Sequence, residues 1–144
     1  MSSMRRRLAA DAGVEAVEFA LVVPVLLMLI SGIVNLGVAF NAATLVTTAV
    51  RDGARVASLG GNVAEMCNAM KGATASLSNG GAANVTIKYG STTVNSTLAT
   101  CNSTAAPNSG ETTTVTLAYQ NQWLIPIVLT GGTTISKSSQ MRVE

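Results

Sequence analysis

The longest apolar stretch of the chain lies between Phe19 and Phe40. Charged residues are absent not only from this stretch but from the whole window between Glu18 and Arg51. A helix of about 20 apolar residues crosses the hydrocarbon core of a bilayer, so the stretch is long enough to span a membrane. A buried core helix of this kind would need a large surrounding protein, which a chain of 144 residues does not supply. The pattern therefore predicts a transmembrane helix.

The predicted helix continues beyond the membrane to about Leu59, where Gly60 and Gly61 end it. In its second half, small apolar residues are interleaved with polar ones at helical spacing. The polar side of this half carries Thr44, Thr47, Thr48, Arg51 and Arg55. A helix from about Val14 to Leu59 would be roughly 70 Å long, and about half of it would stand clear of the bilayer.

The chain beyond Gly60 is rich in Ser, Thr, Asn and Gly, and it predicts a small folded domain. Asn62 followed by Glu65 matches a capping box and predicts a second helix that runs to about Leu77. Alternation of apolar and polar residues predicts three antiparallel strands, at residues 84–89, 111–119 and 133–143. The expected fold class is α+β: a long hydrophobic N-terminal helix, one further helix and a three-stranded antiparallel sheet.

One apolar stretch, Trp123–Leu129, interrupts the polar composition of this domain. It is either a loop that folds onto the sheet or an exposed surface that contacts a neighbouring protein or the membrane, since exposed apolar patches usually mark interfaces. The sequence leaves both interpretations open.

The distribution of charge predicts how the chain is oriented. Arg5, Arg6 and Arg7 form one basic block before the apolar stretch. Basic residues beside a transmembrane helix favour the cytoplasmic side, so we expect a cytoplasmic N-terminus and an exported C-terminal domain. From Val14 onward six basic residues balance six acidic ones, and this balance removes support for a nucleic-acid partner.

The two cysteines, Cys67 and Cys101, both fall in the exported part of the chain by this topology. An oxidising compartment favours a disulfide between them, which would tie the second helix to the segment before the middle strand. In the chain-entropy description a loop of this length contributes about 3–4 kcal/mol of stability. Two thiolates in a chain without histidine are a poor metal site, so we expect no metal and no cofactor.

The most specific pattern lies at the start of the apolar stretch, where a short basic segment ends in Gly13. If the chain were cut after Gly13, Val14 would be the first residue, Glu18 the fifth and Phe19 the sixth. A carboxylate at the edge of a bilayer is costly unless it finds a partner. The new amino group of a neighbouring subunit would be such a partner, and the pair could set the axial register of an assembly.

This junction resembles that of type IV prepilins and, more closely, that of the TadE-like pseudopilins of the tight-adherence (Tad/Flp) secretion system. The matching stretches are Gly13–Pro24, Arg51–Arg55 and the terminal Met141–Glu144. The resemblance implies cleavage between Gly13 and Val14 by a prepilin peptidase. It also implies that the hydrophobic helix packs among other pilin-like subunits.

The resemblance divides the chain into a leader (1–13), a transmembrane and assembly helix (14–60) and an exported α+β domain (61–144) of pilin-like type. Within the helix, Glu18 and Phe19 would act in assembly and register. The protein would cross the bacterial inner membrane once, in contact with its lipid, with the domain in the periplasm or outside the cell. The implied function is that of a non-catalytic minor pilin that helps to build an adhesive pilus or its secretion apparatus.

Other interpretations stay open at this stage. Glu18 could be an ordinary interfacial carboxylate beside an uncleaved signal anchor that tethers a periplasmic binding module. A secretory signal peptide would instead be cut after the apolar stretch, near residues 37–39. An enzyme is disfavoured because the chain has no histidine, no Gly-x-Ser-x-Gly elbow and no phosphate-binding loop.

Overall fold

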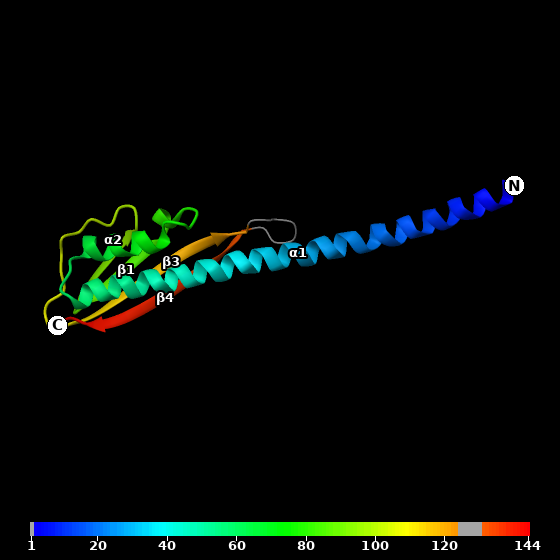
Figure 1. The fold of residues 1–144 in the computed structure, drawn as a ribbon. Helices are drawn as coiled ribbons and strands as arrows, with labels where there is room; N and C mark the ends of the chain where they lie inside the picture. Colours follow the sequence, from blue (N-terminus) through cyan, green and yellow to red (C-terminus); the bar gives the residue numbers. More distant parts are fainter. Residues whose placement is uncertain (1, 124–130) are drawn as a thin grey trace.

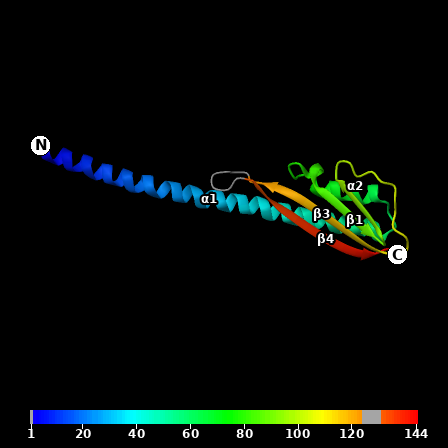
Figure 2. The same ribbon diagram turned by 180° about the vertical axis from the view of Figure 1, so that it is seen from behind.

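The computed structural model of the protein describes residues 2–123 and 131–144, with side chains from Glu15 onward. Its elements are, in chain order, helix α1 (Ser2–Ser58), helix α2 (Val63–Thr74), the 3₁₀ turn η1 (Gly80–Ala82), and strands β1 (Asn84–Tyr89), β2 (Thr92–Thr97), β3 (Thr112–Gln122) and β4 (Gly132–Arg142). Helix α1 is a long rod: its C-terminal half packs against the other elements, and its N-terminal half projects away from them (Figures 1 and 2).

Helix α1 begins earlier than the predicted Val14 and passes through Pro24 as one element. It ends where the two glycines predict. Gly60 has a φ of 77°, a left-handed conformation that glycine adopts without a Cβ clash. The N–H of Gly60 donates to the Ala57 carbonyl at 3.0 Å, and the N–H of Gly61 donates to the Val56 carbonyl at 3.0 Å. These two bonds form a Schellman motif, which satisfies the last carbonyls of the helix.

The surroundings of α1 change near residue 41. Up to Phe40 its large apolar side chains are exposed, whereas beyond it a stripe of small apolar side chains is buried against the domain. The buried stripe comprises Ala42, Val46, Ala49, Val50, Ala54 and Ala57. The predicted polar side of this half is exposed or half-buried, as expected from its helical spacing. The second half of α1 therefore contributes to the core of the domain, in addition to connecting the domain to the projecting half.

Helix α2 begins with the predicted capping box. The Glu65 N–H donates to the Asn62 side-chain oxygen at 2.9 Å, and the Asn62 N–H donates to the Glu65 carboxylate at 3.0 Å. The prediction that this helix runs to Leu77 was wrong, because it ends at Thr74. After it the Leu77 N–H donates to the Thr74 carbonyl, and Asn79 turns the chain with a φ of 60°. This tight turn leads into η1 in place of another helical turn.

Within the described residues four strands form one antiparallel sheet in the order β2-β1-β3-β4. The α+β fold class is confirmed, but the expected count of three strands was wrong because β2 was missed. Strand β2 pairs with β1 through a two-residue turn, in which Gly90 has a φ of 52°. Its six residues contain one apolar side chain, Val94, and lie at the sheet edge. A strand with no apolar face to bury leaves no period-two pattern in the sequence.

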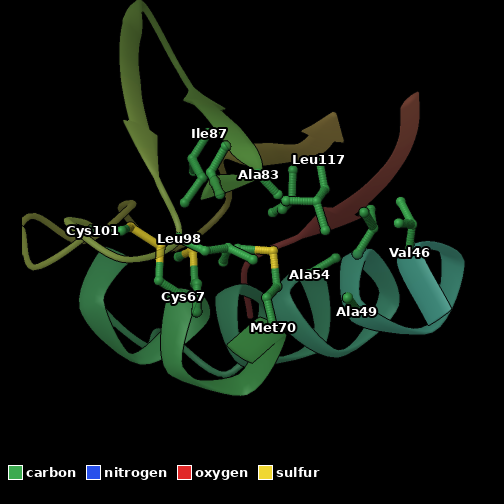
Figure 3. Close-up of a cluster of buried hydrophobic side chains, with 14 of the residues drawn as sticks. Val46, Ala49, Ala54, Cys67, Met70, Ala83, Ile87, Leu98, Cys101 and Leu117 are labelled. Carbon is green, nitrogen blue, oxygen red and sulfur yellow. A yellow bond between two sulfur atoms is a disulfide. The ribbon is translucent and has the colours of Figure 1, made fainter. Parts of the chain in front are cut away.

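The core lies between the inner face of the sheet and the two helices (Figure 3). The register of β1 and β3 places Ile87 opposite Val115 and Val85 opposite Leu117, so their side chains share the inner face. Helix α2 contributes Met66, Cys67 and Met70, all fully buried. Because α1 supplies mostly Ala and Val, the methionines of α2 provide much of the volume that fills the space between the layers.

Strand β3 runs three residues beyond its predicted end at Tyr119. The additional residues are polar, but Asn121 is buried and the strand continues to pair with β4 up to Gln122 opposite Gly132. The Tyr119 hydroxyl donates to the Ser78 carbonyl at 2.7 Å and so connects β3 to the turn after α2. Of the apolar stretch Trp123–Leu129, residues 124–129 lie outside the described residues, and neither interpretation of it is tested.

Candidate functional site

The predicted cleavage and register residues lie in the projecting half of α1. Gly13 and Val14 are within the helix, and Glu18 and Phe19 follow on its exposed surface, with 71% of Phe19 accessible. Glu18 makes no hydrogen bond or ion pair with another described residue. If this half of the helix enters a bilayer, the carboxylate must find its partner outside the described part of the chain.

Most side chains of the same half of α1 are apolar and exposed, as at Leu21 and Ile33, both 72% accessible. Two polar residues, Ser31 and Asn35, are buried. Among the described residues, α1 supplies one helix that is long and apolar enough to cross a membrane. Its exposure rules out the interpretation that this half is the buried core helix of the chain's own domain. The surface is suited to lipid or to other apolar helices.

The predicted Arg51–Arg55 motif has two faces. Gly53 and Ala54 are buried, whereas Arg51, Asp52 and Arg55 are exposed. A Cβ added to Gly53 would lie 2.9 Å from Met70 Cγ, so glycine allows α2 to approach α1 closely at this point. Among the described residues the three charged side chains form no hydrogen bond or ion pair. The inner face of the motif thus positions α2, and its outer face is available to a partner.

We expect Gly53→Leu to destabilise the domain, because the added side chain must displace Met70 from a packed core. Overpacking of this kind typically costs about 1–3 kcal/mol. The measurement is urea unfolding of the full chain in detergent, followed by the fluorescence of Trp123. Gly72→Leu is the control, because a Cβ at Gly72 meets nothing within 4 Å. Equal stability of the two variants would contradict a packing role for Gly53.

Two open grooves flank the exposed side of the motif. One runs along α1 beside β4 and is lined by Phe40, Ala43, Thr44, Thr47, Thr48, Arg51 and Lys137. The other lies toward α2 and is lined by Asp52, Arg55, Val56, Leu59 and Ala69. The sequence did not predict that Lys137 of β4 would come near Arg51, because 86 positions separate them and only the packing of β4 on α1 brings them to one groove.

The two cysteines form a second site in the domain. Cys67 of α2 is joined to Cys101 by a disulfide, with Cα atoms 6.1 Å apart and both side chains buried. The loop that carries Cys101 also caps α2: its carbonyls at Ser103 and Ala105 accept from the Ala64 and Val63 N–H groups at 2.9 Å each. These bonds satisfy amides that have no partner within the helix. Helix α2 lies far from the projecting end of α1 (Figure 1), so the disulfide does not take part in the predicted junction.

These features define a class of protein: an N-terminal helix able to cross a membrane carries a small disulfide-bonded α+β domain. Residues 13–55 match the family model described as TadE-like protein. The resemblance to TadE-like proteins is therefore confirmed over this segment, which begins at Gly13 and ends at Arg55, before α2 and the sheet. No curated protein and no solved structure matches the chain. The match is to this N-terminal segment, and it suggests an association with the Tad pilus system in general terms.

Proposed function

We propose that the protein is a non-catalytic minor pilin of a Tad-type adhesive pilus or of its secretion apparatus. A prepilin peptidase cuts it between Gly13 and Val14, and the mature helix α1 packs among other pilin-like subunits in the inner membrane. The leader lies in the cytoplasm, and the α+β domain lies in the periplasm or beyond. Glu18 pairs with the amino group of a neighbouring subunit during assembly.

The observation that carries this proposal is the projecting apolar half of α1, where the Glu18 carboxylate has no partner among the described residues. An apolar helix that stays exposed over this length gains stability only from lipid or from other helices. The TadE-like match supports the same conclusion because it covers both the junction and the projecting helix. The domain adds a folded unit at the other end of α1 (Figure 2), where it does not obstruct lateral packing of the projecting half.

An uncleaved, signal-anchored binding module remains the alternative, because a tether also needs an apolar helix and a folded domain. The two functions differ at the junction. Assembly requires the leader to be removed so that the new amino group can pair with a carboxylate, whereas a tether works with its leader in place.

We expect the protein purified from its native membranes to begin at Val14. Intact-mass measurement and N-terminal sequencing check this directly. Gly13→Leu is expected to abolish cleavage, because a large side chain would occupy the position that the peptidase must accommodate. Gly37→Leu is the matched control: a Cβ there meets nothing within 4 Å, and the position lies well inside the apolar helix. It should be processed normally.

A retained Met1 or Ser2 in the unaltered protein would overturn the proposed processing and favour the signal-anchored module. An N-terminus near Phe40 would indicate a secreted domain that has lost its membrane helix. Deletion of the prepilin peptidase should leave the unaltered chain uncut, as in Gly13→Leu. Because that chain carries no substitution, its lack of cleavage cannot come from a folding defect.

A further inference from the structure

The groove between α1 and β4 connects the membrane-spanning surface to a pair of cations. At the end of the groove nearest the projecting half of α1 is Phe40, the last large apolar side chain of that exposed half. The same groove is lined by Arg51 of α1 and Lys137 of β4, both exposed. Strand β4 lies along the C-terminal half of α1 in both views (Figures 1 and 2), so the groove follows the helix axis.

We propose that this groove binds the headgroup of an anionic phospholipid, with the phosphate held between Arg51 and Lys137 and the acyl chains directed past Phe40 into the bilayer. The inference rests on the membrane topology of the proposed function. It adds a lipid site on the exported side of the membrane, immediately above the transmembrane segment.

The hydrogen-bonding groups of the groove favour an anion. The threonine hydroxyls already donate to backbone carbonyls one turn earlier, from Thr44 to Phe40 at 2.9 Å, from Thr47 to Ala43 at 2.7 Å and from Thr48 to Thr44 at 3.1 Å. Among the described lining residues, the N–H donors left for a ligand are therefore those of Arg51 and Lys137. No acidic residue is among these lining residues, since Asp52 lines the groove on the α2 side.

The height of Arg51 above Phe40 also fits a headgroup. The Cα of Arg51 stands about 16 Å beyond that of Phe40 along the helix, at 1.5 Å per residue. Side chains of a helix point toward its N-terminus, which here is the direction of the membrane, and long basic side chains extend toward the interface. These two tendencies favour an Arg51 guanidinium that reaches toward the phosphate layer.

The test uses the full chain purified in a neutral detergent and titrated with phosphatidylglycerol or phosphatidylcholine, with bound lipid counted by native mass spectrometry. We expect the protein to prefer phosphatidylglycerol. A basic side chain near an anionic lipid surface contributes roughly fivefold in binding, so the double variant Arg51→Gln/Lys137→Gln should bind phosphatidylglycerol roughly 25-fold more weakly. Both residues are exposed, and the variant should keep its fold and its disulfide.

The matched control is Arg55→Gln/Lys88→Gln, which removes the same types and number of charges outside the groove. It should bind phosphatidylglycerol as the unaltered protein does. Equal loss in the control, no loss in the groove variant, or equal binding of the two lipids would each overturn the proposal. Full competition by inorganic phosphate at millimolar concentration would also overturn it, because it would indicate a free-anion site.

Failure of this test is distinct from failure of the proposed function. Lipid binding in detergent requires neither leader cleavage nor subunit assembly, so a protein with no lipid preference could still be cut at Gly13. Conversely, a chain that retains its leader would keep the groove, because Phe40, Arg51 and Lys137 lie outside residues 1–13.

Discussion

Replacing Cys67 and Cys101 together by alanine is expected to lower the free energy of unfolding of the domain by about 3–4 kcal/mol. The cross-link closes a loop with a sequence separation of 34, and in the chain-entropy description it limits the unfolded chain more than the folded one. Small domains typically have only about 5–15 kcal/mol of net stability, so the loss would be a large fraction of the total. Urea unfolding of the full chain in detergent, followed by Trp123 fluorescence, measures it.

Reduction of the unaltered protein provides the control for this prediction. A reductant removes the cross-link but keeps both sulfur atoms in the core, so the difference between the reduced protein and the double alanine variant reports only lost packing. We expect the reduced protein to account for most of the loss and the variant to be insensitive to reductant. A variant as stable as the oxidised protein would show that the hydrogen bonds between the Cys101 loop and the start of α2 are sufficient by themselves.

The parts of the fold that the sequence predicted are those governed by local chemistry. Asn62 and Glu65 predict the start of α2 because a capping box uses side chains and amides only three residues apart. Gly60 predicts the end of α1 because a left-handed residue is needed there. The apolar stretch predicts a membrane-length helix because length and composition alone decide whether a segment can cross a bilayer.

The parts that were missed depend on tertiary contacts. Strand β2 has one apolar residue. The strand forms because its backbone pairs with that of β1, and not because it has an apolar face to bury. The end of α2 at Thr74 is set by a turn that the residue types of Ala75 and Ser76 do not predict. The same limit applies to the candidate site. The disulfide between the two cysteines was predicted from the chain, and the roles of Gly13 and Glu18 stay predictions. The groove between Arg51 and Lys137 requires knowing that β4 packs beside α1.

The structure also divides the TadE-like segment by physical role. Its first part projects as an apolar surface, and its last part is built into the domain, where Gly53 and Ala54 pack under α2. One helix, which contains Pro24, joins the two parts. In the proposed function, this one segment would contact neighbouring subunits and also carry the domain.

Glu18→Gln is expected to leave the protein processed but largely unassembled. The proposed partner of Glu18 is the amino group of a neighbouring subunit, and a charge-assisted hydrogen bond contributes about 1.5–3 kcal/mol. Its loss should reduce the fraction of the protein in the assembled complex by roughly tenfold or more. The measurement is the amount of the protein that co-purifies with its neighbouring subunits from native membranes, with the N-terminus sequenced to verify cleavage.

Glu15→Gln is the matched control, because Glu15 is also exposed, carries the same charge and lies one turn earlier on α1. It should assemble normally. A carbodiimide, which joins a carboxylate to an amine in direct contact, should link Glu18 to the N-terminal residue of another subunit, and peptide mass spectrometry should find this link in the unaltered protein but not in Glu18→Gln. If Glu18→Gln assembles as well as Glu15→Gln and no such link forms, Glu18 is an ordinary interfacial carboxylate. The register of the assembly would then have to come from the packing of the apolar helix surface alone.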